Sequence, residues 1–207
     1  MSDLRFTLVS DGSSDRALLP LLQWILGQHC TKVFAGEWPD LRQLPRPPRT
    51  LETRIAAAVE LAPCDLLFVH RDAERHEPDA RRAEIAAAVL GSGLPATVPV
   101  VPVRMTEAWL LWNEAAIRRA AGNPNGKDAL GLPAPSEVER RPNPKADLHA
   151  ALLEASGRRG RRRDDLRPSA LSCLVADSIA DFSPLRAATA FARLESDVQR
   201  AIRDRRW

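Results

Sequence analysis

Short apolar runs alternate with amphipathic stretches along the first half of the chain. The runs Phe6–Val9 and Leu66–Val69 have the length and the β-branched and aromatic content of strands buried on both faces. A polar turn and then a stretch of helical periodicity follow each run. This order is typical of parallel strands joined by helical crossovers, so the pattern predicts an α/β fold.

The expected elements follow from the same periodicities. Strands are expected at 5–10, 31–34, 65–70 and 97–103, and helices at 14–28, 51–61, 78–90, 106–121, 145–155, 168–180 and 184–204. Thr50 is placed to cap the second helix, and Pro78 suits the first turn of the third. Pro20 is expected to kink the first helix or to move its start later. Pro99 and Pro102 remove donors from the last strand, which is therefore expected at a sheet edge or irregular.

The composition divides the chain into three parts. Residues 1–121 contain the strand and helix alternation and are expected to form the α/β core, with a proline-bearing loop at 35–49. Residues 122–144 are rich in Gly, Pro and Asn and are expected to be a loop or insertion. Residues 145–207 are expected to be a helical C-terminal part packed on the same domain. The prediction is a mainly parallel four-stranded sheet flanked by helices, with a helical C-terminal region.

The length and the cysteine content exclude several classes of protein. The chain has 207 residues, of which 44% are hydrophobic, enough for one sizeable domain. No apolar run approaches the ~20 residues of a membrane span, and the first residues lack a signal-peptide pattern. We therefore expect no membrane association and a cytoplasmic location. Cys30, Cys64 and Cys173 are far apart and form no C-x-x-C pair, which argues against a zinc site.

Charge is distributed unevenly between the two halves of the chain. Residues 1–103 carry 11 Lys and Arg against 13 Asp and Glu, and residues 104–207 carry 19 against 14. An acidic site in the first half and a basic second half would suit a polyanionic substrate. The run Arg158–Arg163 is the most basic stretch. It can contact phosphates, remain a solvated loop or bind an acidic protein partner.

Two acidic turns follow the two apolar runs. Asp11 and Asp15 come after the first strand, and Asp72 and Glu74 come after the third. Ligands of open α/β sheets bind beyond the carboxyl ends of the strands, so these four carboxylates are expected to converge if the strands are neighbours. Such clustering is costly without a cation, and oxygen ligands suit Mg²⁺ or Mn²⁺. In an extended segment Asp72 and Glu74 would share one face.

Each candidate also has a structural interpretation. Asp11 can satisfy the amides of its own turn, and Asp15 can complement a helix dipole. Glu74 lies among charged neighbours and can be solvated. Glu107 begins a predicted helix and either caps it or adds an acid to the site. His70 either lines the site or is a satisfied strand histidine.

The acidic turns resemble those of the Toprim domain. Asp11-Gly12-x-x-Asp15 and Asp72-x-Glu74 match its arrangement of an acid after the first strand and an acidic pair after the third. The segments Thr106–Leu111, Asn143–Lys145 and Leu185–Phe191 are similar to those of small Toprim-like proteins of the DUF4276 group, relatives of the OLD-type nucleases. The resemblance covers most of the chain.

The resemblance implies Mg²⁺- or Mn²⁺-dependent cleavage of phosphodiester bonds in nucleic acid. Lys145 would stabilise phosphate charge, and Asp11 would act as a metal ligand or as general acid and base. A separate ATPase partner and a role in anti-phage defence are also implied. The implied metal ligands are Asp11, Asp15, Asp72, Glu74 and Glu107, and the implied catalytic residues are Asp11, Asp72, Glu107 and Lys145.

Two departures from the family pattern leave other functions open. Asp11 stands where the family has glutamate, and Glu74 stands where it has aspartate. Because a misplacement of about 1 Å can cost on the order of 100-fold in rate, a weakened nuclease is one outcome. A non-catalytic Toprim-like scaffold or binding subunit of an ATPase complex is the alternative. A receiver-like phosphotransfer domain is a third hypothesis, but its usual Thr and Lys are not evident.

Overall fold

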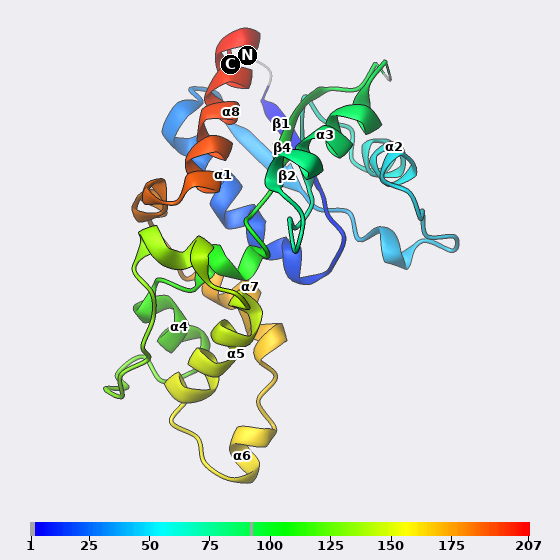
Figure 1. The fold of residues 1–207 in the computed structure, drawn as a ribbon. Coiled ribbons are helices and arrows are strands. Elements are labelled where there is room, and N and C mark those ends of the chain that lie inside the picture. The colour runs from blue at the N-terminus through cyan, green and yellow to red at the C-terminus, as the bar shows by residue number, and fades with distance from the viewer. Residues whose placement is uncertain (1–2, 92) are drawn as a thin grey trace.

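The computed structural model describes residues 3–91 and 93–207, without the side chain of Asp164, as a parallel four-stranded sheet flanked by helices (Figure 1). The order of the strands across the sheet is β2-β1-β3-β4, and all three pairings are parallel. This confirms the predicted fold class. The strands are β1 (Leu4–Val9), β2 (Phe34–Glu37), β3 (Leu66–His70) and β4 (Ala96–Val100).

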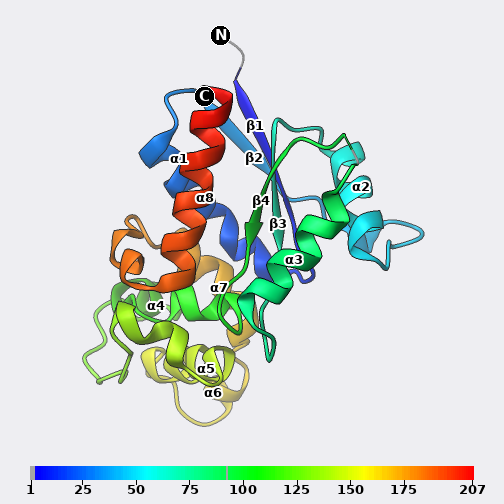
Figure 2. The same cartoon turned by 45° about the horizontal axis from the view of Figure 1, so that its top comes forward.

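Helices cover both faces of the sheet, and a helical part lies beyond the carboxyl ends of its strands. The α-helices are α1 (Leu18–His29), α2 (Leu51–Leu61), α3 (Pro78–Val89), α4 (Glu114–Ala120), α5 (Pro144–Ala155), α6 (Arg161–Asp164), α7 (Pro168–Asp177) and α8 (Thr189–Arg205). α1 and α8 lie on one side of the sheet and α2 and α3 on the other (Figure 2). α4, α5 and α7 form the helical part, and none of the described helices is both long and apolar enough to cross a membrane.

The central strands bury both faces because their side chains alternate between two cores. Leu66 and Phe68 of β3 belong to the larger core, and Leu67 and Val69 belong to the smaller core against α2 and α3. The larger core also contains Trp109 and residues of α4, α5, α7 and α8. The sheet and the C-terminal helices are therefore joined by continuous apolar packing.

The prolines place β4 at the edge of the sheet, as predicted. The backbone N–H of Arg71 donates to the carbonyl of Val100, so Val100 directs its backbone groups toward β3. Pro99, the preceding residue, directs its backbone to the free edge, where its missing N–H leaves no ladder bond unmade. Thr50 caps α2 and Pro78 occupies the first turn of α3, as predicted.

Several boundaries differ from the predictions, and two of them have a clear physical cause. β2 begins at Phe34 rather than ending there, because Gly36 pairs with Phe6 and lets the Phe6 ring lie over the strand. The helix predicted at 106–121 is a 3₁₀ turn, Thr106–Leu110, followed by α4, whose start is capped by the side chain of Asn113. The first helix begins as a 3₁₀ turn, Ser14–Ala17, and α1 starts at Leu18 with Pro20 in its first turn, the later start that Pro20 predicted.

Candidate active site at the carboxyl edge of the sheet

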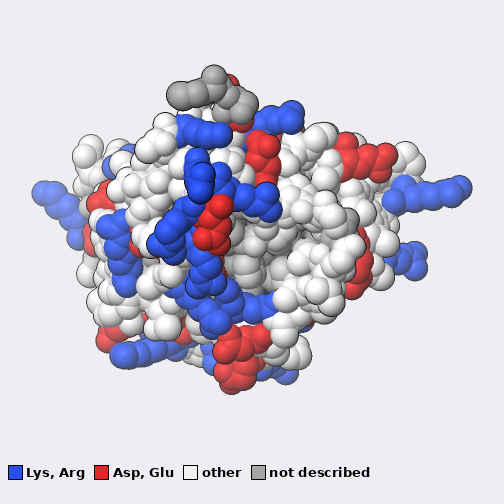
Figure 3. All heavy atoms as spheres, turned by 90° about the horizontal axis from the view of Figure 1, so that it is seen from above, with Lys and Arg blue, Asp and Glu red and all other residues white. Residues whose placement is uncertain are grey.

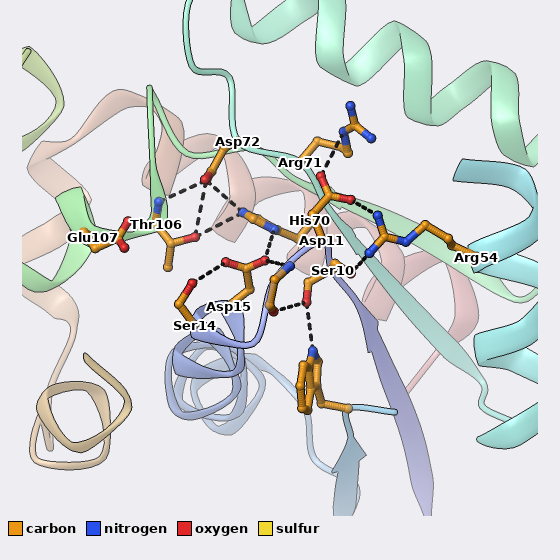
Figure 4. A network of polar contacts seen from close by, with 12 residues as sticks. Ser10, Asp11, Ser14, Asp15, Arg54, His70, Arg71, Asp72, Thr106 and Glu107 are labelled. Carbon is orange, nitrogen blue, oxygen red and sulfur yellow. Dashed lines mark hydrogen bonds and ion pairs between the residues drawn. The ribbon is translucent and has the colours of Figure 1, made fainter. Parts of the chain in front are cut away.

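The two acidic turns lie side by side because β1 and β3 are adjacent and parallel, as predicted. Val9, the last residue of β1, pairs with Val69, one residue before the end of β3, so both turns open on the same hollow of about 330 Å³. Figure 4 shows the polar network around it. The residues lining the hollow are Asp11, Gly12, Ser14, Asp15, His70, Arg71, Asp72, Glu74 and Arg81.

His70 lies at the centre of this network. It is the last residue of β3 and only 1% exposed. Its Nε2 is 3.0 Å from Oδ1 of Asp72 and 3.1 Å from the hydroxyl of Thr106. Its Nδ1 lies 3.4 Å from Oδ2 of Asp15, an ionic contact without good hydrogen-bond geometry. The imidazole ring therefore separates the two carboxylates (Figure 4).

The two carboxylates beside His70, those of Asp15 and Asp72, favour the charged form of the histidine. Burial by itself lowers the pKa of His70, but the contacts with Asp15 and Asp72 outweigh it and raise the pKa to about 9. Burial raises the pKa of Asp15, yet the neighbouring His70 and the Gly12 N–H bring it below its usual value. The imidazolium thus compensates two carboxylates at neutral pH.

Backbone donors fix the two acids that flank His70. The N–H of Gly12 donates to Oδ2 of Asp15 at 2.7 Å. The N–H of Thr106 donates to Oδ1 of Asp72 at 3.0 Å. The contacts of Asp72 thus converge on one oxygen, and Oδ2 has no hydrogen bond or ion pair with another residue in the described part of the chain. Asp72 therefore keeps one oxygen available to a ligand.

Asp11 lines the hollow but turns its carboxylate away from Asp72 (Figure 4). It forms an ion pair with Arg54 of α2, whose guanidinium also donates to the carbonyl of Ser10 at 2.6 Å. Its other oxygen is 3.5 Å from Nε of Arg71. Asp11 is therefore an acid that is neutralised by two arginines.

Glu74 does not share a face with Asp72, so that expectation was wrong. The expectation assumed an extended segment, but Glu74 has φ of 53° and turns the chain. Its N–H donates to the carbonyl of Arg104 at 2.8 Å, and its side chain is 59% exposed. Arg81 is the nearest cation, at 3.9 Å. Glu74 is therefore an exposed acid that lines the hollow together with Asp72.

Glu107 and Lys145 face the sheet edge from the helical part. Glu107 belongs to the 3₁₀ turn Thr106–Leu110, next to Thr106, and is buried. Burial raises the pKa of its carboxyl, and Asp72 and Asp15 raise it further, whereas Lys145 opposes the shift. Nζ of Lys145, at the start of α5, is 3.9 Å from Oε1 of Glu107. The two residues predicted from distant segments therefore lie together.

The site's own cations compensate its carboxylates. In the described part of the chain no three or more His, Cys, Asp or Glu side chains are grouped so that they could hold a metal ion. The free oxygen of Asp72 and the carboxyl of Glu107 are still ligands of the type that a hard cation prefers. The residue types thus fit Mg²⁺ or Mn²⁺. Asp11, Asp15 and Glu74 could join as further ligands only if each gave up its contact with an arginine or with His70. The acids at the hollow are Asp11, Asp15, Asp72 and Glu74, and the cations are Arg54, His70, Arg71 and Arg81.

The sequence did not reveal several of these partners. Arg54 belongs to α2, 43 residues from Asp11 along the chain, and no local pattern connects the two. Thr106 was noted only as part of a motif. The available signal for His70 was its position at the end of a buried strand, two residues before Asp72. The chain matches no protein-family model, no curated protein and no solved structure.

Proposed function

We propose that the protein is a Toprim-like nuclease that hydrolyses phosphodiester bonds with the help of Mg²⁺ or Mn²⁺. The observation that supports this most strongly is the position of Asp72, which has one oxygen fixed by Thr106 and His70 and the other free. Glu107 and Lys145 approach the same edge from the helical part. Acids at the ends of adjacent parallel strands are placed where α/β proteins bind ligands.

Asp72 and Glu107 would hold the metal first, and Asp11, Asp15 and Glu74 could add ligands. Bound there, the metal would activate water and stabilise charge on the phosphate oxygens. His70 and Thr106 keep the carboxylate of Asp72 oriented before any ligand arrives.

The arginines of the hollow can change partners. Arg71 contacts Asp11 at 3.5 Å and Arg81 contacts Glu74 at 3.9 Å, and both also pair with Glu84, at 3.2 and 2.8 Å. A phosphodiester offers both guanidiniums another anion, with bidentate geometry. Its binding would free Glu74 and Oδ2 of Asp11 for the metal, while Oδ1 of Asp11 stays paired with Arg54. Substrate and metal should therefore favour each other's binding. Lys145 is placed to offset phosphate charge at the opposite side.

Cleavage of labelled single- and double-stranded DNA and RNA tests the proposal. Purified protein is incubated with Mg²⁺ or Mn²⁺, alone and with a co-purified ATPase partner. Asp72→Asn should lower the rate by ~100-fold or more, because it keeps the shape but removes a metal ligand. Asp165→Asn, at an exposed position in the helical part, should leave the rate unchanged. Absence of cleavage under every condition would contradict the proposal.

A second candidate is a non-catalytic Toprim-like binding subunit of an ATPase complex. The pairing of the site's carboxylates with the protein's own cations favours it, because such a site is electrically balanced without a metal. This candidate predicts no stabilisation by Mn²⁺. If that is observed, Asp11→Glu becomes informative, since a gain of metal binding would trace the lost activity to the shorter acid. The ATPase partner and a defence role rest on the sequence resemblance.

A further inference from the structure

A second hollow adjoins the acidic one, and its lining contains more basic than acidic side chains. It has a volume of about 440 Å³ and meets the acidic hollow at Glu74. Its walls come from the turn after β3, the loop after β4 and the segment leading into α5. It is lined by Glu74, Arg75, His76, Arg104, Met105, Pro142 and Asn143.

The arginines of this second hollow are not engaged. Within the described residues, the side chains of Arg75 and Arg104 make no hydrogen bond or ion pair. By contrast, Arg54, Arg71 and Arg81 of the acidic hollow all contact carboxylates. Two arginines without partners among the described residues line one hollow against the single carboxylate of Glu74, which leaves a net positive charge there. An anion would find these donors available without displacing an internal partner.

The backbone holds this arrangement in an unusual conformation. Glu74 and Arg104 both have positive φ, 53° and 64°, which non-glycine residues adopt at a cost of about 1 kcal/mol or more. The two loops are tied by the bond from Glu74 N–H to Arg104 O and by another from Ala73 N–H to Pro102 O, at 3.2 Å. These two hydrogen bonds hold the turn that carries Asp72 and Glu74 against the loop that carries Arg104. The two hollows therefore share a common backbone support.

We propose that Arg75 and Arg104 form a phosphate subsite that holds a nucleic-acid strand next to the acidic hollow. The proposal rests on the proposed function for the identity of the ligand, a phosphodiester of a polynucleotide. A strand running past Glu74 would place one phosphate at the guanidiniums of the second hollow and expose another to Asp72. Planar guanidiniums suit phosphate because they donate two parallel hydrogen bonds.

Metal-free binding tests the subsite without requiring cleavage. Fluorescence anisotropy of a short labelled single-stranded oligonucleotide is measured in EDTA, with DNA and RNA versions. The variant Arg75→Ala/Arg104→Gly removes both charges, and glycine accepts the positive φ of position 104. Arg46→Ala/Arg49→Ala removes two exposed arginines from the loop before α2 and is the charge-matched control. Melting curves establish that each variant is folded, and Arg75→Ala alone avoids the constrained position.

The subsite predicts that Arg75→Ala/Arg104→Gly lowers affinity by ~10-fold or more and reduces the salt slope by about 1–2, while the control changes affinity by less than about 2-fold. Equal affinity of the wild type and the subsite variant, or no binding by the wild type, would overturn it. Competition by adenosine monophosphate as strong as that by the oligonucleotide would overturn a polynucleotide ligand. If binding depends on Arg75 and Arg104 but Mn²⁺ supports no cleavage, the subsite proposal stands and the nuclease proposal is refuted.

Discussion

At the scale of single residues, His70 determines the electrostatics of the site. Its ring lies between Asp15, which is buried, and Asp72, which is partly exposed, and a charged imidazole offsets the repulsion between their carboxylates. The charge argument that suggested a metal from the sequence is therefore met by the protein itself. What still favours a metal is the free oxygen of Asp72 and the nearby carboxyl of Glu107.

The stability of the metal-free protein should fall as pH rises above neutrality. The pKa of His70 is raised from 6.5 to about 9 in the folded protein, so its stabilising contribution is complete below pH 6.5. It is lost as pH rises through 9, by on the order of 3 kcal/mol. Urea unfolding in EDTA across this window measures the slope. His70→Gln, which carries no charge, should flatten it, and an unchanged slope in that variant would refute the assignment.

Asp72→Ala should destabilise the protein in EDTA. Judged from the sequence, removal of one acid from a crowded cluster would relieve repulsion, but the contacts of Asp72 reverse this expectation. The substitution leaves the Thr106 N–H without its acceptor and His70 with one fewer counter-charge. A loss of about 1–3 kcal/mol is expected from urea unfolding. Glu74→Ala is the comparison, because among the described residues this exposed side chain has one ion pair, with Arg81 at 3.9 Å, and should change stability little. Equal effects would contradict the role given to Asp72.

The sequence predicted which acids lie at the strand ends, but not how they point. Position follows from the pattern of apolar runs, whereas orientation depends on partners from elsewhere in the chain. Asp11 turns away from Asp72 because Arg54 of α2 donates to its carboxylate. Arg54 is 43 residues further along the chain, so no local pattern could predict this contact. Glu74 leaves the shared face because its backbone is left-handed, a conformation that no local pattern signals for glutamate.

At the scale of elements, prolines and helix caps predicted where strands and helices lie, whereas Gly36 gave no sign of where β2 begins. Pro99 indicated an edge strand and Thr50 the start of α2, since both act through their own backbone neighbours. β2 was misplaced because its strand depends on a long-range contact, the approach of Gly36 to Phe6. The helix predicted at 106–121 was interrupted by the Asn113 cap, whose effect outweighs the continuous apolar periodicity.

Gly36→Ala should destabilise the protein more than a helical glycine substitution does. A Cβ at position 36 would lie 2.0 Å from Cζ of Phe6, a fully buried ring, so the strand or the ring must shift. A cost of about 1–3 kcal/mol is expected. Gly27→Ala, whose Cβ would meet its nearest atom at 3.9 Å inside α1, should be neutral or stabilising by up to about 1 kcal/mol. Thermal unfolding of both variants provides the comparison, and a neutral Gly36→Ala would contradict the packing described for β2.

At the scale of the whole molecule, positive charge is not confined to one surface. α6, which contains Arg161–Arg163, lies at the end of the helical part remote from the chain termini (Figure 1). At the opposite end, Lys and Arg side chains gather with acidic ones beside the end of α8 (Figure 3). The excess of basic residues in the second half therefore does not identify a nucleic-acid surface by itself.

Replacing Arg161, Arg162 and Arg163 with alanine separates the interpretations of the basic run. If the exposed run contacts nucleic acid, binding should weaken and the salt slope should fall by roughly 2–3. The measurement is oligonucleotide anisotropy at several salt concentrations, with Arg46→Ala/Arg49→Ala as the comparison. An unchanged slope would assign α6 to solvent or to a protein partner and leave the second hollow as the phosphate contact.

The central claim is that Asp72 anchors a divalent metal at the carboxyl edge of the sheet. The most direct test is the change in melting temperature when Mn²⁺ is added to EDTA-stripped protein. A metal at about 100 times its dissociation constant stabilises the fold by ~2.7 kcal/mol, which should raise the wild-type Tm by about 5–10 °C. Asp72→Asn should lose most of this shift, and Asp165→Asn should retain it. No shift in the wild type, or the same shift in Asp72→Asn, would contradict the claim.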